Sequence, residues 1–361
     1  MSRLPTIRMP RKEEVRDMAD ELGFCLSEED VASFTELFSG PISSYNRLDE
    51  LVEPKLEVKY PRTPGTRPEA SENKLNAWAW RCEVKGATSG PLKGKTIALK
   101  DNIALAGVPM SNGTSILEGF IPDIDASVVT RILDGGGTIT GKAANTYLCF
   151  DGASHTTATG MVENPRKAGY TAGGSSAGSA ALVANKDVDM ALGGDQGGSI
   201  RIPACWSGIY GLKPSYGLIP YTGIFPIEQT LDHTGPMARS VHDIASLLDV
   251  TAGVDGFDPR QKAPLKQDYL ADLSKGVDGL RIGVVEEGFG HPNSEDIVDS
   301  SVNDAVSALE RAGAVVERIS IPMHAGATHL GRYSKRGSRD PNDAWKRLRN
   351  KLAWLLRYTF D

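Results

Sequence analysis

Residues 10–54 carry apolar side chains at intervals of three and four, the spacing of one face of a helix. Ser27 stands three residues before Asp30, a capping-box pattern that predicts the start of a second helix. The pair Gly40-Pro41 predicts a break or kink in that helix, with a further helix after it. We interpret the whole segment as a helical cap on the main domain, with a dimer contact as the alternative.

Short apolar runs alternate with helical patterns after about residue 78, which is typical of an α/β sheet with helices on its faces. We find no internal repeat in the chain. In chain order, the expected elements are a strand at 96–99 that ends in Lys100, a helix at 127–133, a β-prone run after 137–141, a helix at 179–184, strands at 188–192 and 280–285, a helix at 298–312 and a strand at 314–321.

Composition and charge exclude several classes of protein. The chain has 361 residues, 40% of them hydrophobic and 24% charged, with a formal net charge of −6, all ordinary for a globular protein. The chain lacks the excess of basic residues that binding to nucleic acid or an anionic membrane would need, and no apolar run is long enough to span a bilayer. Because the N-terminus lacks an apolar leader, we expect a cytoplasmic protein, with four separate reduced cysteines. The six histidines have no metal-ligand spacing, so no metal site is expected.

Composition also divides the chain. We expect an N-terminal helical cap or dimerisation segment at 1–58, an extended proline-rich linker at 59–77, a main domain at 78–330 and an atypical basic tail at 331–361. The tail holds nine Lys/Arg against three Asp/Glu, together with two tryptophans. Such a tail can bind nucleic acid or membrane. We favour an appended or aberrant terminus, and expect neither partner.

Two glycine-rich segments are the strongest local signals. The first covers residues 171–179 and the second covers residues 193–204. Glycine allows close backbone approach and unusual backbone angles. A serine in such a loop can lie beside exposed N–H groups, and N–H groups aimed at developing negative charge form an oxyanion hole.

A nucleophilic serine needs a base, and no histidine lies in or beside these segments. Lys100 is the better candidate, because it ends the apolar strand Ile97-Ala98-Leu99. Burial at a sheet end lowers the pKa of a lysine and can leave it neutral near pH 7. The alternative is a plain surface lysine at the end of a strand.

Several motifs, taken together and in order, resemble the amidase signature family. They are KDNIA (100–104), GGSSAGS (173–179), GGDQGGSIRIPA (193–204) and GLKPSYGLIP (211–220). The separations of Lys100, Ser175 and Ser199 also agree with the family. The resemblance covers roughly residues 80–325, and it implies a mixed central sheet flanked by helices, incomplete here because the family's C-terminal third is missing.

The resemblance implies a role for each matching residue. Ser199 corresponds to the acylated nucleophile, Ser175 to a bridging serine after a cis peptide bond, and Lys100 to the base. The oxyanion hole is implied at the N–H groups of Gln196, Gly197, Gly198 and Ser199. We expect Asp195 and Arg201 to brace the loop, and Phe150, Gly174 and Ser176 to contact substrate. An aromatic residue at position 150 can equally be plain core.

The resemblance further implies an amidase that hydrolyses small aliphatic or aromatic carboxamides to acid and ammonia, with no metal or organic cofactor. The helical lead and the Asp195-Gln196 pair are similar to broad-spectrum bacterial amidases, which implies a homodimer. One alternative is a protein like the tRNA-dependent amidotransferase A subunit, which typically has Asp-Thr at this pair. Another is a truncated, catalytically impaired remnant whose pocket is open on one side.

Two motif matches compete with this interpretation. Residues 174–178 fit G-x-S-x-G, the nucleophile elbow of α/β-hydrolases with Ser176 as nucleophile, but residues 163–170 cannot form the buried strand that an elbow requires. Residues 136–142 nearly match a phosphate-binding P-loop, but Ala143 replaces the required Ser/Thr. We discard both.

Overall fold

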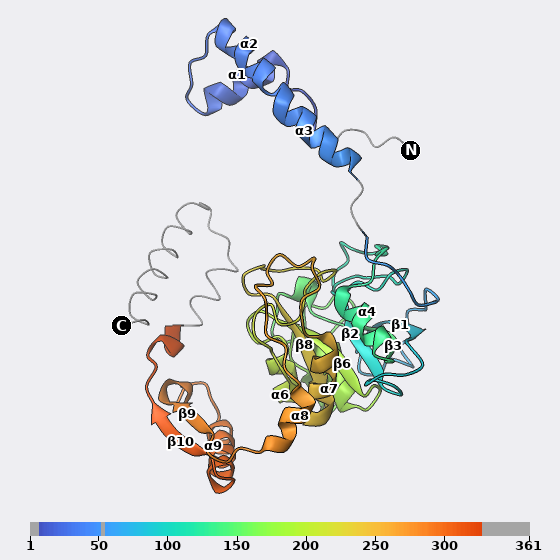
Figure 1. The fold of residues 1–361 in the computed structure, drawn as a ribbon, viewed down its shortest axis with the longest axis vertical. Coiled ribbons are helices and arrows are strands. Elements are labelled where there is room, and N and C mark those ends of the chain that lie inside the picture. Colours follow the sequence, from blue (N-terminus) through green and yellow to red (C-terminus); the bar gives the residue numbers. More distant parts are fainter. Residues whose placement is uncertain (1–6, 52–54, 327–361) are drawn as a thin grey trace. The chain divides into compact units, whose positions relative to one another are not determined.

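The computed structural model describes residues 7–51 and 55–326 and divides the chain into two compact units, Met1–Lys55 and Leu56–Asp361 (Figure 1). The division falls close to position 58, where the sequence places the end of the helical segment. The tail expected at 331–361 lies outside the described residues.

The N-terminal unit consists of three helices, α1 (Lys12–Glu21), α2 (Glu28–Leu37) and α3 (Ser39–Glu50). The predicted capping box is confirmed: Asp30 N–H donates to Ser27 Oγ, and the Asp30 carboxylate accepts from Ser27 N–H. The predicted break is confirmed as well, since α2 ends before the Gly40-Pro41 pair and α3 carries it in its first turn. The unit's buried apolar side chains are Val15, Ala19, Val31 and Ile42.

A six-stranded mixed sheet forms the centre of the second unit, in the order β1-β3-β2-β6-β8-β7. The mixed α/β fold expected from the sequence is confirmed. Strand β2 runs parallel to both its neighbours, β3 and β6, whereas β1 and β8 run antiparallel to theirs. The strands are β1 (Trp78–Lys85), β2 (Thr96–Lys100), β3 (Thr138–Ala143), β6 (Met190–Asp195), β7 (Tyr210–Gly211) and β8 (His233–Ala238).

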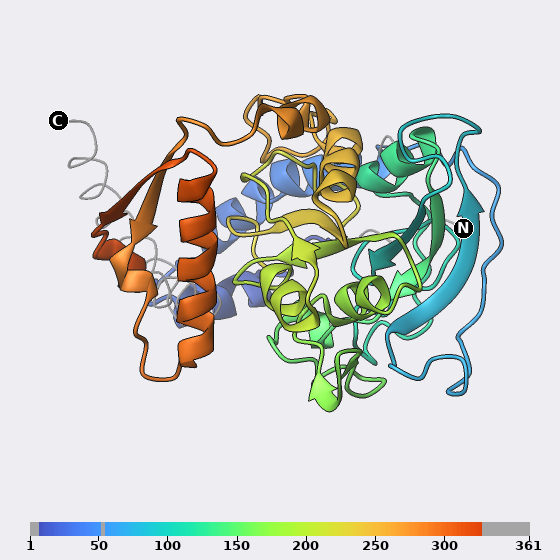
Figure 2. The same cartoon turned by 90° about the horizontal axis from the view of Figure 1, so that it is seen from below.

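Helices cover both faces of this sheet (Figure 2). Alternate side chains of a strand point to opposite faces. Ile97 and Leu99 of β2 join one cluster with helices α4 (Ser127–Asp134) and α7 (Val241–Thr251). Ala98, between them, joins another with α5 (Ala177–Ala184) and α6 (Arg201–Ser207). The small side chains on this second face let α5, buried along its whole length, pack closely on the strands.

Smaller elements complete the described chain. Residues 59–73 run without regular structure but contact the main unit, where Tyr60 hydroxyl donates to Asp134 at 2.7 Å and Arg62 pairs with Asp125. Strand β9 (Arg281–Val285), helix α9 (Asp296–Arg311) and strand β10 (Val315–Ile319) follow one another as the sequence predicts, and the two strands pair in parallel. The remaining elements are η1 (Tyr147–Cys149), β4 (Glu163–Asn164), β5 (Lys167–Thr171), α8 (Tyr269–Asp272), η2 (Leu273–Lys275) and η3 (Glu286–Gly288).

Candidate active site

The parallel pairing of β2 with β6 brings Lys100 to the second glycine-rich segment. Leu99 pairs with Leu192, so both strands end at the same edge of the sheet, and Lys100 lies beside the chain that continues into residues 193–199. The Lys100 amine donates to the Gly194 carbonyl at 3.3 Å. Parallel topology therefore gathers residues that are far apart in the sequence.

Lys100 and Ser175 form a buried hydrogen-bonded pair. The Lys100 amine lies 2.7 Å from Ser175 Oγ, and both residues are 0% exposed. Burial lowers the pKa of the Lys100 ammonium from its ordinary value, because removal from water disfavours the charged form. The pair therefore combines a lysine biased toward its neutral form with a hydroxyl within hydrogen-bond reach.

The first glycine-rich segment holds Ser175 against a neighbouring loop. The Gly174–Ser175 peptide bond is cis. A Cβ at Gly174 would lie 2.9 Å from the Ala153 nitrogen and the Asp151 carbonyl, so only glycine fits there. Ser175 accepts at its carbonyl from Thr146 N–H at 3.2 Å. Gly174 thus serves close backbone packing on residues 146–153.

Ser199, the third residue of the predicted triad, contacts the residue that follows Ser175. Its carbonyl accepts from Ser176 N–H at 3.1 Å, which holds the backbones of the two serine loops together, and the residue is 7% exposed. The Ser176 hydroxyl is fully buried and is bonded to Gly194, accepting from its N–H and donating to its carbonyl, both at 3.1 Å. Ser176 therefore connects the two glycine-rich segments.

Asp195 and Arg201 brace the loop, as predicted. The buried Asp195 carboxylate accepts from Arg201 Nε at 2.9 Å and Nη2 at 3.0 Å, and from the N–H groups of Gly198 at 2.8 Å and Ile200 at 3.2 Å. Burial acts to raise the pKa of Asp195, but the guanidinium and these N–H groups outweigh it and hold the pKa below its ordinary value. Since Gly198 N–H is bonded to Asp195, this predicted oxyanion donor is occupied within the loop.

The other predicted oxyanion residues lie on the same turn. Gly197 is exposed, whereas Gln196 is 8% exposed. Gln196 Nε2 donates to Asp232 Oδ1 at 2.8 Å and to Tyr221 hydroxyl at 3.3 Å. The side chain of Gln196 is thereby anchored in protein, which leaves its backbone as the part that can face a ligand.

The family model described as Amidase matches residues 68–337. The chain belongs to the amidase signature family. An enantioselective amidase of Rhodococcus rhodochrous is 44% identical over 328 residues, covering 90% of this chain and 63% of that protein. The A subunit of the glutamyl-tRNA(Gln) amidotransferase of Haloarcula marismortui is also 44% identical, over 241 residues, 66% of this chain and 56% of that protein.

Solved structures agree with this assignment. The A subunit of the glutamyl-tRNA(Gln) amidotransferase of Thermotoga maritima superposes with a TM-score of 0.68 at 30% identity, covering 78% of this chain and 64% of that one. The peptide amidase of Stenotrophomonas maltophilia superposes with a TM-score of 0.62 at 37% identity, covering 68% of this chain and 51% of that one. The chain thus spans between about half and two thirds of the length of these relatives.

Sequence reasoning missed Cys149, which this amidase-family chain buries beside Lys100 and Ser175. Its thiol is 2% exposed, donates to Asn112 Oδ1 at 3.2 Å and accepts from Asn145 Nδ2 at 3.3 Å. Burial raises the pKa of this thiol, which favours the protonated form. No motif marks such a contact, because it depends on the left-handed backbone of residues 148 and 149.

Phe150 follows Cys149 on the loop that packs on Gly174. It is 55% exposed, so the alternative of a plain core aromatic is wrong. Its predicted contact with substrate stays a prediction.

The structure argues against both competing motifs. Residues 167–171 form a strand, β5, but its residues are largely exposed, so the buried strand of a nucleophile elbow is absent there, as the sequence predicts. Residues 138–143 of the near P-loop form β3, where Lys142 donates to Asp101 Oδ1 at 3.0 Å. That lysine is committed to a carboxylate and not to a phosphate cradle.

Within residues 7–51 and 55–326, no three His, Cys, Asp or Glu side chains converge as metal ligands would. Over the same residues, no helix combines the length and apolar character needed to cross a bilayer.

Proposed function

We propose that this chain is an amide hydrolase in which Lys100, Ser175 and Ser199 form the catalytic triad. The observation that carries the proposal is the buried hydrogen bond between the Lys100 amine and Ser175 Oγ, at 2.7 Å. In water a lysine is protonated at pH 7, whereas burial lowers the pKa of Lys100 and so favours the neutral amine, the form that can accept a proton. We propose small aliphatic or aromatic carboxamides as substrates.

The proposed reaction has two stages. Ser199 Oγ attacks the amide carbon while its proton passes to Ser175 Oγ and the Ser175 proton passes to Lys100 Nζ. The N–H groups of Gln196, Gly197 and Ser199 stabilise the oxyanion. Gly198 N–H takes no part, because it already donates to Asp195, whose role is to hold the loop in shape. Lys100 returns its proton through Ser175 to the leaving nitrogen, and ammonia departs. Water then attacks the acyl-Ser199 ester, by the same proton route, and the acid is released.

This chemistry uses side chains and backbone alone, so the proposal includes no metal or organic cofactor. We further propose that the protein works in the cytoplasm as a homodimer. Light scattering coupled to size-exclusion chromatography tests the dimer directly, because a monomeric mass at micromolar concentration contradicts it.

Ammonia release from benzamide and propionamide tests the hydrolase. We expect Ser199→Ala to lower kcat at least about 10⁴-fold, since loss of a triad nucleophile removes the covalent route. Ser215→Ala, at an exposed serine, is the matched control and is expected to retain full activity. Equal rates for the wild type and Ser199→Ala would overturn the proposal and favour a remnant without activity.

A second candidate function is that of an amidotransferase A subunit. It is favoured by the identity of 44% to the Haloarcula marismortui protein. Ammonia release from glutamine, in preference to benzamide and propionamide, would support this candidate. A sulfonyl fluoride separately reports whether the serines are assembled, because only an activated Ser199 gains the mass of the reagent.

A further inference from the structure

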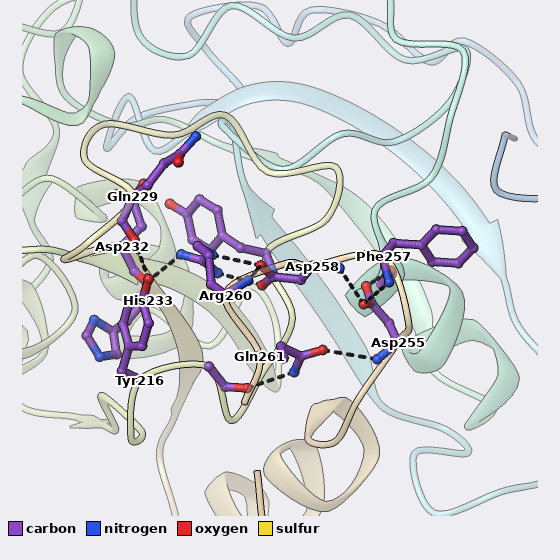
Figure 3. A network of polar contacts seen from close by, with 12 residues as sticks. Tyr216, Gln229, Asp232, His233, Asp255, Phe257, Asp258, Arg260 and Gln261 are labelled. Atoms are coloured by element: carbon purple, nitrogen blue, oxygen red, sulfur yellow. Dashed lines mark hydrogen bonds and ion pairs between the residues drawn. The ribbon is translucent and has the colours of Figure 1, made fainter. Parts of the chain in front are cut away.

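A polar network begins at Gln196 and extends away from the candidate active site. Its first contact is between Gln196 Nε2 and Asp232 Oδ1, at 2.8 Å. Tyr221 hydroxyl accepts from the same nitrogen at 3.3 Å. Figure 3 shows the contacts beyond Gln196: Asp232 lies beside His233, and Arg260 lies between Asp232 and Asp258 of the loop of residues 255–261.

Asp232 is itself firmly placed. It is 1% exposed, and its Oδ2 accepts from Ile227 N–H at 3.1 Å and from Glu228 N–H at 3.2 Å. The next residue, His233, begins β8 and pairs with Asp195 at the end of β6. Asp232 is therefore tied to the sheet that carries the glycine-rich loop, and its carboxylate is a rigid acceptor.

A second tier holds Asp232 and Tyr221 from the other side. Arg260 Nη1 donates to the Asp232 carbonyl at 3.0 Å, and its guanidinium lies 4.6 Å from the centre of the Tyr221 ring. Asp258 accepts from Arg260 Nη2 at 2.7 Å and from Tyr221 N–H at 2.9 Å. The loop of residues 255–261 thus fixes both acceptors of the Gln196 amide.

We propose that Asp232 is a positioning residue for the oxyanion-binding turn, acting through the side chain of Gln196. This inference rests on the proposed function. Gln196 is the first residue after β6, so its backbone orientation sets the direction of the N–H groups that follow. With its amide held by Asp232 and Tyr221, the turn cannot rotate without breaking two buried hydrogen bonds. Asp232 does not itself touch substrate.

Hydrogen-bond polarity makes the proposal testable. Both Asp232 oxygens accept hydrogen bonds, one from Gln196 and both from backbone N–H groups. In D232N one oxygen becomes an NH₂ donor, which either meets those N–H groups or turns toward Gln196, whose amide must then flip so that Oε1 accepts and Nε2 loses its carboxylate partner. In the double variant Q196E/D232N, a new carboxylate at position 196 accepts from the new amide, and the remaining amide oxygen accepts from the backbone.

We expect D232N to lower kcat for benzamide by about 10- to 100-fold with little change in KM, because the misplaced donors act on the transition state. We expect Q196E/D232N to recover most of that loss. Q196E alone places two carboxylates together and is expected to be as impaired as D232N. Gln229→Ala changes an exposed side chain three residues before Asp232. It is the control and is expected to keep the wild-type kcat.

The outcomes separate the two proposals. A wild-type chain that releases no ammonia overturns the proposed function, and the positioning role falls with it. An active wild type with an unchanged kcat in D232N overturns the positioning role alone. A loss in D232N that the double variant does not recover also overturns it, because a general disturbance of folding then explains the loss.

Discussion

At the scale of single residues, the burial of Lys100, the proposed base, also makes the stability of the fold depend on pH. Its pKa is lowered by burial from the ordinary value of 10.5. Between the folded and unfolded pKa values, the unfolded chain binds more protons, so the stability of the wild type rises with pH across that window. Below the folded pKa, the cost of holding a buried ammonium is present in full.

We therefore predict that Lys100→Met removes activity and changes the pH dependence of stability. Methionine has a similar length and no charge, so the variant gains most, relative to the wild type, at low pH. The difference in unfolding free energy between variant and wild type is expected to shrink as pH rises toward 10.5. Urea unfolding at pH 6 and pH 9 measures it, and a difference independent of pH would contradict the buried-amine argument.

The second buried lysine, Lys142, stabilises the fold through a buried ion pair. Its amine lies 3.0 Å from Asp101 Oδ1, and the two side chains are 0% and 1% exposed. Removing one partner of such a pair leaves an uncompensated buried charge, which costs about 3–5 kcal/mol. We predict this loss for Lys142→Met in denaturant unfolding.

Lys85→Met is the control for Lys142→Met. Lys85 pairs with Glu83 on β1, but its side chain is 75% exposed. An exposed pair contributes about 0–1 kcal/mol, so the control should unfold near the wild-type midpoint. Similar losses in both variants would show that burial of the Lys142 pair is not what matters.

The sequence predicts the burial of Lys100 but not the contact between Asp232 and Gln196, for a physical reason. Lys100 ends an apolar strand, and a local pattern reveals both its burial and its position at a sheet edge. Asp232 accepts a hydrogen bond from Gln196, which lies 36 residues earlier in the sequence. Their contact depends on the antiparallel pairing of β6 with β8, which no local pattern records.

At the scale of elements, the strands that the sequence predicts are those with clear runs of apolar residues, and a strand without such a run was missed. Strand β2 matches the expected range, and β9 and β10 lie within theirs. Strand β8 was missed, because its sequence His-Thr-Gly-Pro-Met-Ala holds two residues that disfavour strands. Helix α6 was missed because Pro203 lies within it, near its start, where a missing N–H costs little. The order of the strands needs long-range pairing and could not be predicted from local patterns.

Helix α5 shows how packing overrides helix propensity. A Cβ at Gly178 would lie 2.3 Å from the Ala77 carbonyl and 2.5 Å from the Ala144 nitrogen. Alanine is the better helix former by about 1 kcal/mol, but these backbone atoms cannot move aside. We predict that Gly178→Ala destabilises the protein by about 1–3 kcal/mol, the usual cost of overpacking, as measured by denaturant unfolding.

The comparison that decides this prediction is Gly288→Ala in η3. There the nearest atom to a new Cβ lies 3.9 Å away, on the His324 ring. The unfolding midpoint of this control should stay close to that of the wild type. A stabilised Gly178→Ala variant would mean that α5 lies farther from the strands than described.

At the scale of the whole molecule, the two units differ in the size of their cores. In the described part of the first unit, four apolar side chains are buried, whereas the second has two extended clusters around its sheet. The stability that burial supplies grows with apolar area removed from water. We therefore expect the three N-terminal helices to open at lower free energy than the sheet.

The last prediction uses Val31, which is 0% exposed in α2. Val31→Ala removes two buried methyl groups, which costs about 2 kcal/mol, a large share of what so small a core supplies. Hydrogen exchange should then lose protection over residues 12–50 while β2 and β6 keep theirs. Leu37→Ala, on the same helix but 66% exposed, is expected to leave protection unchanged. If the two cores are independent, destabilising the N-terminal core leaves the opening free energy of the sheet unchanged. Equal loss of protection in the N-terminal helices and in β2 would therefore mean that the two units open together.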